Sequence, residues 1–172
     1  MWIPTECDYA WAAGFVEADG SFSLNVVSRK SKHGTEQLAI MPNVQASQVN
    51  PAPLIKLIQI AYHKDSKKSK LFFETKSNGV IAIHANIVGR ARLEEFLLRI
   101  TPHISGKQKQ VALLLEALKI QKPKGGNGKS TRRYTAAEFT RFREISTEIK
   151  TLNKQRKYIL SSEVPNLEVD AK

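Results

Sequence analysis

Asp19 is the residue whose position points most directly to chemistry. It follows a run of small and apolar residues, 11–18, that is typical of a helix, and it precedes Gly20, a residue that commonly ends one. From Phe22 onward apolar and polar residues alternate, as they do in a strand. Asp19 is therefore expected at the carboxyl end of a helix, where the helix dipole is unfavourable for a carboxylate. A divalent cation would relieve this repulsion, so the sequence favours a metal-binding acid at this corner.

The helix that must position Asp19 has a face with very little side chain. Thr5 is a suitable N-cap, and acidic residues occupy the first turn. Ala10, Gly14 and Ala18 then recur at every fourth position and fall on one stripe of the helix. Such a stripe lets a second backbone approach closely, which predicts a helix-to-helix interface.

The segment 12–20 resembles the LAGLIDADG motif of homing endonucleases. Ala12 stands at the position of the leading Leu, and Glu17 conservatively replaces the first Asp; the other residues match or stay apolar. The family uses its second acid for metal, so the resemblance implies that Asp19, with the carbonyl of Ala18, binds Mg²⁺ or Mn²⁺. It also implies a homodimer whose interface contains Ala10, Ala13, Gly14, Glu17 and Ala18. The alternative is an ordinary helix–glycine–strand corner with an unrelated Asp.

The composition favours a nucleic-acid partner. Lys and Arg number 27 against 16 Asp and Glu, which gives a net charge of +11. Such an excess predicts a polyanionic partner, nucleic acid before an anionic membrane. The 172 residues, 41% of them hydrophobic, suit one domain with a substantial core. The single cysteine excludes an internal disulfide or a cysteine-based zinc site. No apolar run reaches membrane-spanning length and no signal peptide is evident, so we expect no membrane partner.

Strand and helix patterns alternate along the chain. Strands are expected over about 21–29, 36–47, 70–76 and 80–84, and helices after Asn50-Pro51, from Asn86, from Ser105 and from Thr135. With the first helix, the order is α-β-β-α-β-β-α-α-α. This order is the core unit of LAGLIDADG endonucleases, so the resemblance implies an α+β fold with an antiparallel four-stranded saddle sheet and additional C-terminal helices. We expect one domain over 1–172, with a core of about 5–121, a basic loop and helix over 122–160, and a tail of 161–172.

The outward face of the expected sheet is rich in side chains that can read bases. In the related enzymes the sheet lies over the DNA major groove, which a two-stranded ribbon fits. Asn and Gln can pair with adenine there, and Arg and Lys with guanine. The residues predicted to contact DNA are Ser23, Asn25, Arg29, Lys30, Lys32, Gln37, Asn43, Gln45, Glu74, Lys76 and His84. Without the motif, a solvated polar sheet face would be the preferred interpretation.

Two more local matches to the family concern catalysis. The segment 44–48 resembles the end of the family's second strand, where a Gln lies at the active site, and Gln48 matches that position. An amide can hold an attacking water by hydrogen bonds. The segment 106–110 resembles the family's Lys-Gln-Lys-Gln sequence, whose first Lys, here Lys107, lies in the catalytic pocket. A strand-end turn residue and a surface lysine of a first helical turn are the respective alternatives.

These features together predict a site-specific, intron-encoded homing endonuclease. The resemblance implies a homodimer that makes a Mg²⁺-dependent double-strand cut in a long pseudo-palindromic DNA target, with Asp19, Gln48 and Lys107 as the catalytic residues. It also implies that the gene lies in a mobile group I intron of an organelle, a chloroplast or mitochondrion. The alternative is a non-cleaving nucleic-acid binder, such as a maturase that binds its own intron RNA.

Overall fold

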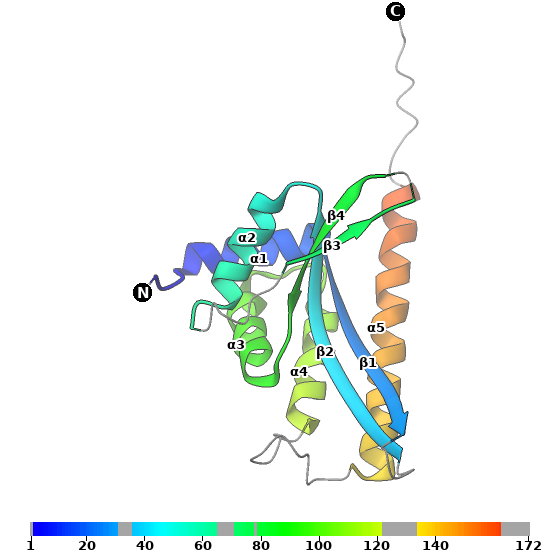
Figure 1. Ribbon diagram of the computed structural model, residues 1–172. Helices are drawn as coiled ribbons and strands as arrows, with labels where there is room; N and C mark the ends of the chain where they lie inside the picture. Colours follow the sequence, from blue (N-terminus) through cyan, green and yellow to red (C-terminus); the bar gives the residue numbers. More distant parts are fainter. Residues whose placement is uncertain (1, 31–35, 65–70, 78, 122–133, 163–172) are drawn as a thin grey trace, which may run out of the picture.

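The computed structural model describes residues 2–30, 36–64, 71–77, 79–121 and 134–162 (Figure 1). Within these ranges the side chains of 28–30, 36–38 and 156–162 are not described. The elements are α1 (Glu6–Asp19), β1 (Gly20–Lys30), β2 (Glu36–Gln48), α2 (Pro51–Ala61), β3 (Leu71–Thr75), β4 (Ile81–Ile87), α3 (Arg90–Ile100), the 3₁₀ turn η2 (Thr101–His103), α4 (Gln108–Ile120) and α5 (Ala136–Ser162). The predicted order of helices and strands is therefore confirmed.

The four strands form one antiparallel sheet in the order β1-β2-β4-β3. β1 and β2 make a long hairpin whose pairing runs from Gly20 opposite Ala46 to Lys30 opposite Glu36. β4 pairs with β2 only along Val44–Gln48, so the first part of β2 has β1 as its one neighbour in the sheet. Pro42 lies in this singly paired part, which suits a residue with no backbone N–H to donate.

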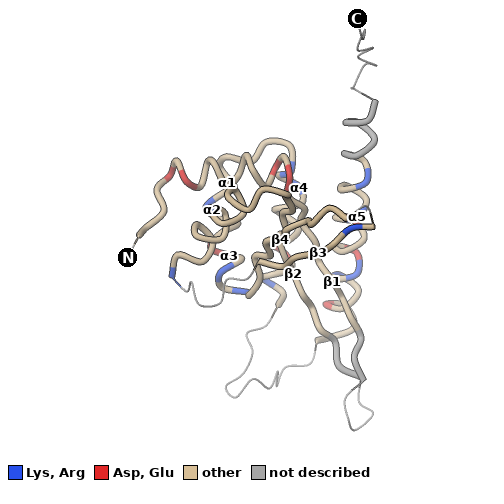
Figure 2. The backbone as a smooth tube through the Cα atoms, turned by 45° about the horizontal axis from the view of Figure 1, so that its top comes forward, with Lys and Arg blue, Asp and Glu red and all other residues tan. Residues whose placement is uncertain are grey.

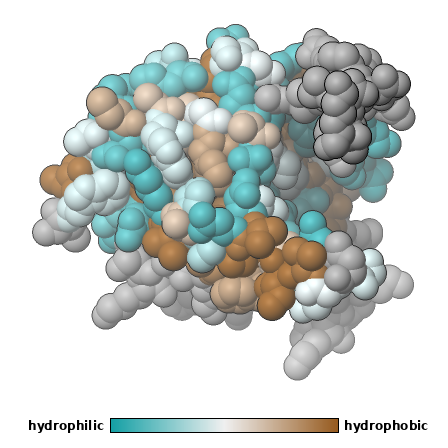
Figure 3. Space-filling view, turned by 90° about the horizontal axis from the view of Figure 1, so that it is seen from above, coloured by the Kyte–Doolittle hydropathy of each residue, from teal (hydrophilic) through white to brown (hydrophobic). Residues whose placement is uncertain are grey.

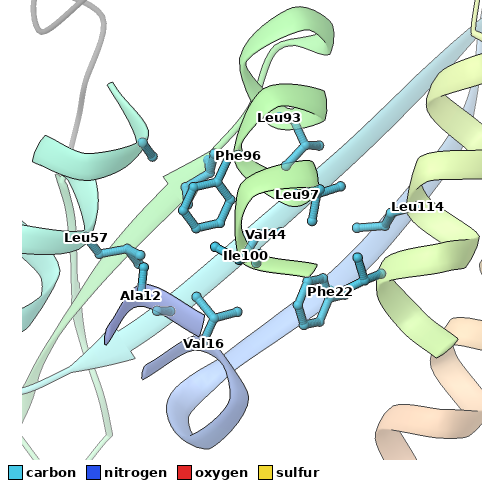
Figure 4. Close-up of a cluster of buried hydrophobic side chains, with 14 of the residues drawn as sticks. Ala12, Val16, Phe22, Val44, Leu57, Leu93, Phe96, Leu97, Ile100 and Leu114 are labelled. Atoms are coloured by element: carbon cyan, nitrogen blue, oxygen red, sulfur yellow. The ribbon is translucent and has the colours of Figure 1, made fainter. Parts of the chain in front are cut away.

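One face of the sheet is buried under helices, and this contact forms the core (Figure 4). Alternate residues of β1 and β2, such as Phe22 and Val44, are fully buried, and the residues between them point to the opposite face. The helices contribute apolar side chains that pack against these strand residues; the labelled ones in Figure 4 are Ala12, Val16, Leu57, Leu93, Phe96, Leu97, Ile100 and Leu114. The core thus leaves the second sheet face open for the predicted polar residues.

Two predicted helix starts are wrong. Asn86 lies inside β4, opposite Gln45 of β2, because the alternation of buried residues continues through Ile87. α3 begins instead after Gly89, whose φ of 95° favours glycine. Ser105 does not cap α4 either, because its hydroxyl and N–H donate to Glu17, and the N-cap position belongs to Lys107.

The long helix α5 protects the free edge of the sheet. β1 is an edge strand, and α5 packs beside it (Figure 1). The Ser146 hydroxyl donates to the Leu24 carbonyl at 2.6 Å, and the Asn153 amide donates to the Phe22 carbonyl at 2.9 Å. These bonds satisfy backbone acceptors that would otherwise be open to another strand. In the part of the chain that the structure describes, no helix is both long and apolar enough to cross a membrane.

Candidate active site and nucleic-acid interface

The helix that carries Asp19 is fixed at its start by a capping box. The Thr5 N–H donates to the Asp8 carboxylate at 2.9 Å, and the Asp8 N–H donates to the Thr5 hydroxyl. This reciprocal pair satisfies two N–H groups that a helix start leaves open. α1 is 14 residues long and ends at Asp19, which is exposed at the corner with β1.

Gly20 is required at this corner by a close approach. Its φ of −93° and ψ of 161° are extended values that any residue adopts, so the left-handed conformation that often ends helices is not used here. A Cβ atom built on Gly20 would lie 2.6 Å from the Val16 carbonyl oxygen and 2.7 Å from a Val16 side-chain carbon. The absence of a side chain therefore lets the chain turn directly from helix to strand beside Asp19.

Lys107, the N-cap residue of α4, contacts the same corner. Its side chain is buried, with 4% of the residue exposed, and its ammonium donates to the carbonyls of Val16, at 2.9 Å, and Gly20. These carbonyls lie at the negative end of the α1 dipole, which a cation stabilises. The sequence alternative of a solvent-exposed surface lysine is therefore wrong.

Glu17 makes the reverse contact between the same two segments. Its carboxylate accepts bonds from the Ser105 N–H at 3.3 Å, from the Ser105 hydroxyl at 3.2 Å, and from the Gly106 N–H. We call the contacts of Glu17 and Lys107 with each other's segments the double lock. It joins α1 to the segment before α4 by bonds in both directions, and it fixes the backbone on both sides of Asp19.

The strand register brings Gln48 to the same end of the β1–β2 hairpin as Asp19. Gly20 is opposite Ala46, so the residue before Gly20 and the last residue of β2 both lie beyond this pair. Gln48 is half-buried, whereas Ala18 and Asp19 are exposed. Among the described residues, no group of three or more His, Cys, Asp or Glu side chains could hold a metal ion. The described residues of one chain therefore form no complete cluster of metal ligands at this corner.

The small-residue stripe of α1 is exposed, with one correction. Ala10, Gly14 and Ala18 are exposed, and a Cβ added at Gly14 would have no atom within 4 Å. Ala13, also predicted at the dimer interface, is fully buried in the chain's own core and is not part of the exposed stripe. Ala13 belongs to the motif, but a helix turns about 100° per residue, so Ala13 lies on a different side of α1 from Gly14.

An aromatic pair lies next to this stripe on α1. Trp11 and Phe15 are half-buried and stacked, with ring centroids 5.3 Å apart and an angle of 8° between the planes. The Lys56 ammonium lies 4.4 Å from the centre of the Trp11 ring. The small-residue stripe is thus bordered on one side by two stacked aromatic side chains.

The open face of the sheet holds a connected polar network. His84 lies at its centre, with Nε2 2.9 Å from the Glu74 carboxylate and Nδ1 2.6 Å from the Ser47 hydroxyl. The Gln45 amide is 3.3 Å from the same Nδ1, and on the neighbouring strand pair the Ser23 hydroxyl donates to Asn43 at 3.0 Å. The structure therefore places five of the residues predicted to contact DNA in two hydrogen-bonded groups, Gln45 and Glu74 with His84, and Ser23 with Asn43.

The remaining predicted contacts are less well placed by the structure. Asn25 and Lys76 are exposed. Arg29, Lys30 and Gln37 lie in β1 and β2, but their side chains are outside the described set, and Lys32 lies outside the described residues altogether.

An exposed apolar patch on the β3–β4 hairpin was not predicted. Phe73 is 71% exposed, and Phe72, Val80 and Ile81 are exposed as well. Seen from above, hydrophobic residues gather along one border of the molecule at this hairpin (Figure 3). The sequence held one hint, because three consecutive apolar residues, 71–73, cannot all point into one core.

Comparison with known proteins relates this geometry to one class of structures. No protein-family model matches the chain, and no curated protein sequence matches it. Among solved structures, the chain is similar to the homing endonuclease I-CvuI in complex with the I-CreI target, with 20% identity over 86% of this chain and 82% of that one and a TM-score of 0.61. It is also similar to the archaeal intron-encoded homing endonuclease I-Vdi141I complexed with DNA, with 15% identity, 86% and 84% coverage and a TM-score of 0.62. It is similar as well to the homing endonuclease I-TnaI, with 16% identity over 92% of this chain and 99% of that one and a TM-score of 0.54.

The motif helix, the four-stranded antiparallel sheet and the helices behind it define an α+β fold of the homing-endonuclease class. This chain has the LAGLIDADG fold, as the sequence predicts. At these identities the likeness concerns the fold, and the activity is a separate question.

Proposed function

We propose that the protein is a homodimeric, Mg²⁺-dependent DNA endonuclease that cuts both strands of a long pseudo-palindromic site. The observation that carries this proposal is the exposed Asp19 at the end of the exposed small-residue stripe of α1. An unpaired carboxylate at a helix C-terminus is electrostatically unfavourable on its own. A metal shared with a second copy would explain both features at once.

The dimer in this proposal is formed by two α1 helices that cross at Ala10, Gly14 and Ala18. Closed two-fold assemblies are the commonest oligomers, and their interfaces are self-complementary. The open space around Gly14 admits a second backbone, and Trp11 and Phe15 would border the contact. The two-fold axis would bring both Asp19 carboxylates together at the carboxyl ends of the helices.

The chemistry is hydrolysis of a phosphodiester bond. Mg²⁺, held by the two Asp19 carboxylates and the Ala18 carbonyls, would lower the pKa of a bound water and neutralise the phosphate. Gln48, at the same end of the hairpin, would orient the attacking water through its amide. Lys107 would act through the backbone, because its contacts in the structure are to the Val16 and Gly20 carbonyls. The catalytic role predicted for Lys107 itself stays a prediction.

DNA would lie across the open face of the sheet. The network around His84 would present amide and carboxylate groups to base edges in the major groove, and the two-fold dimer would read two inverted half-sites. The solved structures of I-CvuI, I-CeuI and I-Vdi141I contain DNA, which supports a DNA partner here. I-CeuI is encoded by a group I intron, which supports an intronic origin, and an organellar location remains part of the proposal.

The test is incubation of the purified protein with a plasmid that carries the intronless insertion region of its host gene, with Mg²⁺ and with EDTA. We expect one Mg²⁺-dependent double-strand cut at a unique position. Tight duplex binding without a cut in either Mg²⁺ or Mn²⁺ would contradict the enzyme. In that case binding of the intron RNA would be measured, because the maturase alternative predicts it.

A further inference from the structure

The exposed side of α5 carries a stripe of three cations and one hydroxyl. Arg143, Thr147, Lys150 and Lys154 follow one another at spacings of four, three and four residues, and all are exposed. At 1.5 Å per residue these positions span about 16 Å along one face of the helix. We call this row the α5 basic stripe. Basic residues recur along α5 beside β1 in Figure 2.

The acids of α5 are held on other sides of the helix. Glu144 accepts a bond from Arg141 at 3.0 Å, Glu148 pairs with Lys109 of α4 at 2.9 Å, and Glu138 belongs to the cap of the helix. Among the residues that the structure describes, none of the three cations of the stripe forms an ion pair. The guanidinium of Arg143 lies 4.3 Å from the centre of the Phe139 ring, an arrangement that keeps its charge. The described residues therefore leave the positive charge of the stripe without a neutralising acid.

The contacts of α5 show which way the stripe faces. Ser146 and Asn153 face β1, because they bond its carbonyls, whereas Arg141 and Glu148 face α4. At 100° per residue, the centre of the stripe lies about 80° from the β1 contacts, on the side away from α4. α4 belongs to the layer of helices that covers the buried face of the sheet. Because the stripe points away from α4, it lies beyond the free edge of β1, on the side of the open sheet face.

We propose that the α5 basic stripe binds the phosphate backbone of duplex DNA that lies on the open sheet face. This proposal rests on the proposed function, and it adds a contact surface beyond the sheet and the active-site corner. Lys and Arg contact phosphate oxygens, and the Thr147 hydroxyl can donate to them as well. Such contacts add affinity and fix the position of the duplex without reading its sequence. The occupant is duplex DNA because the stripe continues the surface on which the duplex is placed.

The salt dependence of binding tests this proposal. One variant combines Arg143→Gln, Lys150→Gln and Lys154→Gln. Its control combines Lys64→Gln, Arg99→Gln and Lys119→Gln, which remove the same charge from exposed positions elsewhere on the chain. The Kd for a duplex carrying the target is measured between about 50 and 200 mM salt. Each phosphate contact contributes about 0.9 to the slope of log K against log salt, so the stripe variant should lose about 2.7 per chain. The control should lose less than about 1.

Each outcome decides the proposal. Equal slopes for the stripe variant and the wild type, or an equal loss in the control, would overturn it. A loss of binding to intron RNA with an unchanged DNA slope would also overturn it. If the triple variant does not fold, Lys150→Gln alone is measured, with an expected loss of about 0.9. If the wild type binds the duplex but does not cleave it, the proposed nuclease function is contradicted, and the salt slopes still test the stripe. If the wild type does not bind duplex DNA at all, the proposed function and the role of the stripe are both overturned.

Discussion

Lys107 and Glu17 show how two buried or half-buried charges are accommodated at one corner. Burial of an ammonium is costly unless its hydrogen bonds are made, and here two backbone carbonyls accept them. Glu17 in turn satisfies the N–H groups of Ser105 and Gly106. Both charges are therefore paired with backbone groups, and the double lock leaves the neighbouring Asp19 exposed and available.

Asp19→Asn should abolish cleavage and preserve DNA binding. The amide keeps the shape of the side chain but removes the negative charge that a divalent cation needs. Cleavage should fall by a factor on the order of 10³ or more, while the Kd for the target changes little. Plasmid cleavage and a binding assay in Ca²⁺ measure the two properties, with Glu94→Gln on α3 as a control. Cleavage retained by the Asn variant would remove Asp19 from its proposed role.

Lys107→Met should destabilise the protein and reduce cleavage. Methionine fills a similar volume but leaves the carbonyls of Val16 and Gly20 without the ammonium, a loss of about 1–3 kcal/mol in the free energy of unfolding. Lys109→Met is the matched control, because it removes an exposed ion pair worth less than about 1 kcal/mol. Denaturant unfolding and the cleavage rate report the two effects. Equal destabilisation by both variants would show that the buried bonds carry no special weight.

At the scale of elements, α1 separates its two faces by residue size. Tyr9, Ala12, Ala13 and Val16 pack inward, whereas the exposed side is almost bare backbone at Gly14. A glycine in an exposed helix interior costs about 1 kcal/mol relative to alanine. The proposed close contact with a second α1 accounts for that cost.

Gly14→Leu should block dimer formation and leave the monomer folded. The added side chain meets no atom of its own chain within 4 Å of the Cβ, so the fold should be unchanged or slightly stabilised. Sedimentation should give a monomer for this variant. Ala112→Leu adds comparable bulk to an exposed position of α4 and should leave the dimer intact. A normal dimer in the Gly14→Leu variant would mean that the stripe is not the interface.

The sequence predicted helix starts correctly where the capping side chain bonds a backbone N–H in the first turn of the same helix. Thr5 and Thr135 cap helices as expected, because the hydroxyl of each accepts a bond from the N–H three residues ahead. Asn86 has the same local preference, but pairing with β2 extends β4 through it. Tertiary pairing therefore overrode a local preference at that residue.

The candidate site was predicted in part for the same reason. Asp19 and Gly20 are neighbours in sequence, so their pattern reveals a corner. The bond from Ser105 to Glu17 spans 88 residues, and no spacing rule predicts such a partner. The network of Gln45, His84 and Glu74 likewise depends on the strand order, since alternation gives the face of each residue but not its neighbour across the sheet.

At the scale of the whole molecule, ion pairs between helices make stability depend on pH. The bidentate bonds from Arg141 hold the pKa of Glu116 below its ordinary value of 4.5, and the Lys64 ammonium lowers the pKa of Glu95. A carboxyl whose folded pKa is depressed adds stability above the unfolded pKa, and this stability is lost as the pH falls through the folded pKa. The protein should therefore lose stability progressively below a pH of about 4.5.

Glu116→Gln should reduce this pH dependence. At pH 7 the variant should unfold at a lower temperature, by an amount equivalent to about 0.5–1 kcal/mol because the pair is partly exposed. At a pH of about 3 the difference from the wild type should shrink, since protonation weakens the same pair in the wild type. Thermal unfolding at the two pH values measures the effect. A difference that stays constant between the two conditions would contradict the assigned ion pair.

The double lock also sets the order in which the protein can become active during its synthesis. Lys107 bonds a carbonyl 91 residues before it, so the corner around Asp19 is fixed only after the segment that carries Lys107 has left the ribosome. Domains gain their native contacts as the polypeptide emerges, N-terminal parts first. A truncated product that ends before Ser105 would carry the motif helix without its restraint. The emerging chain would thus hold Asp19, the proposed metal-binding acid, in place only once the helices that complete the core are also present.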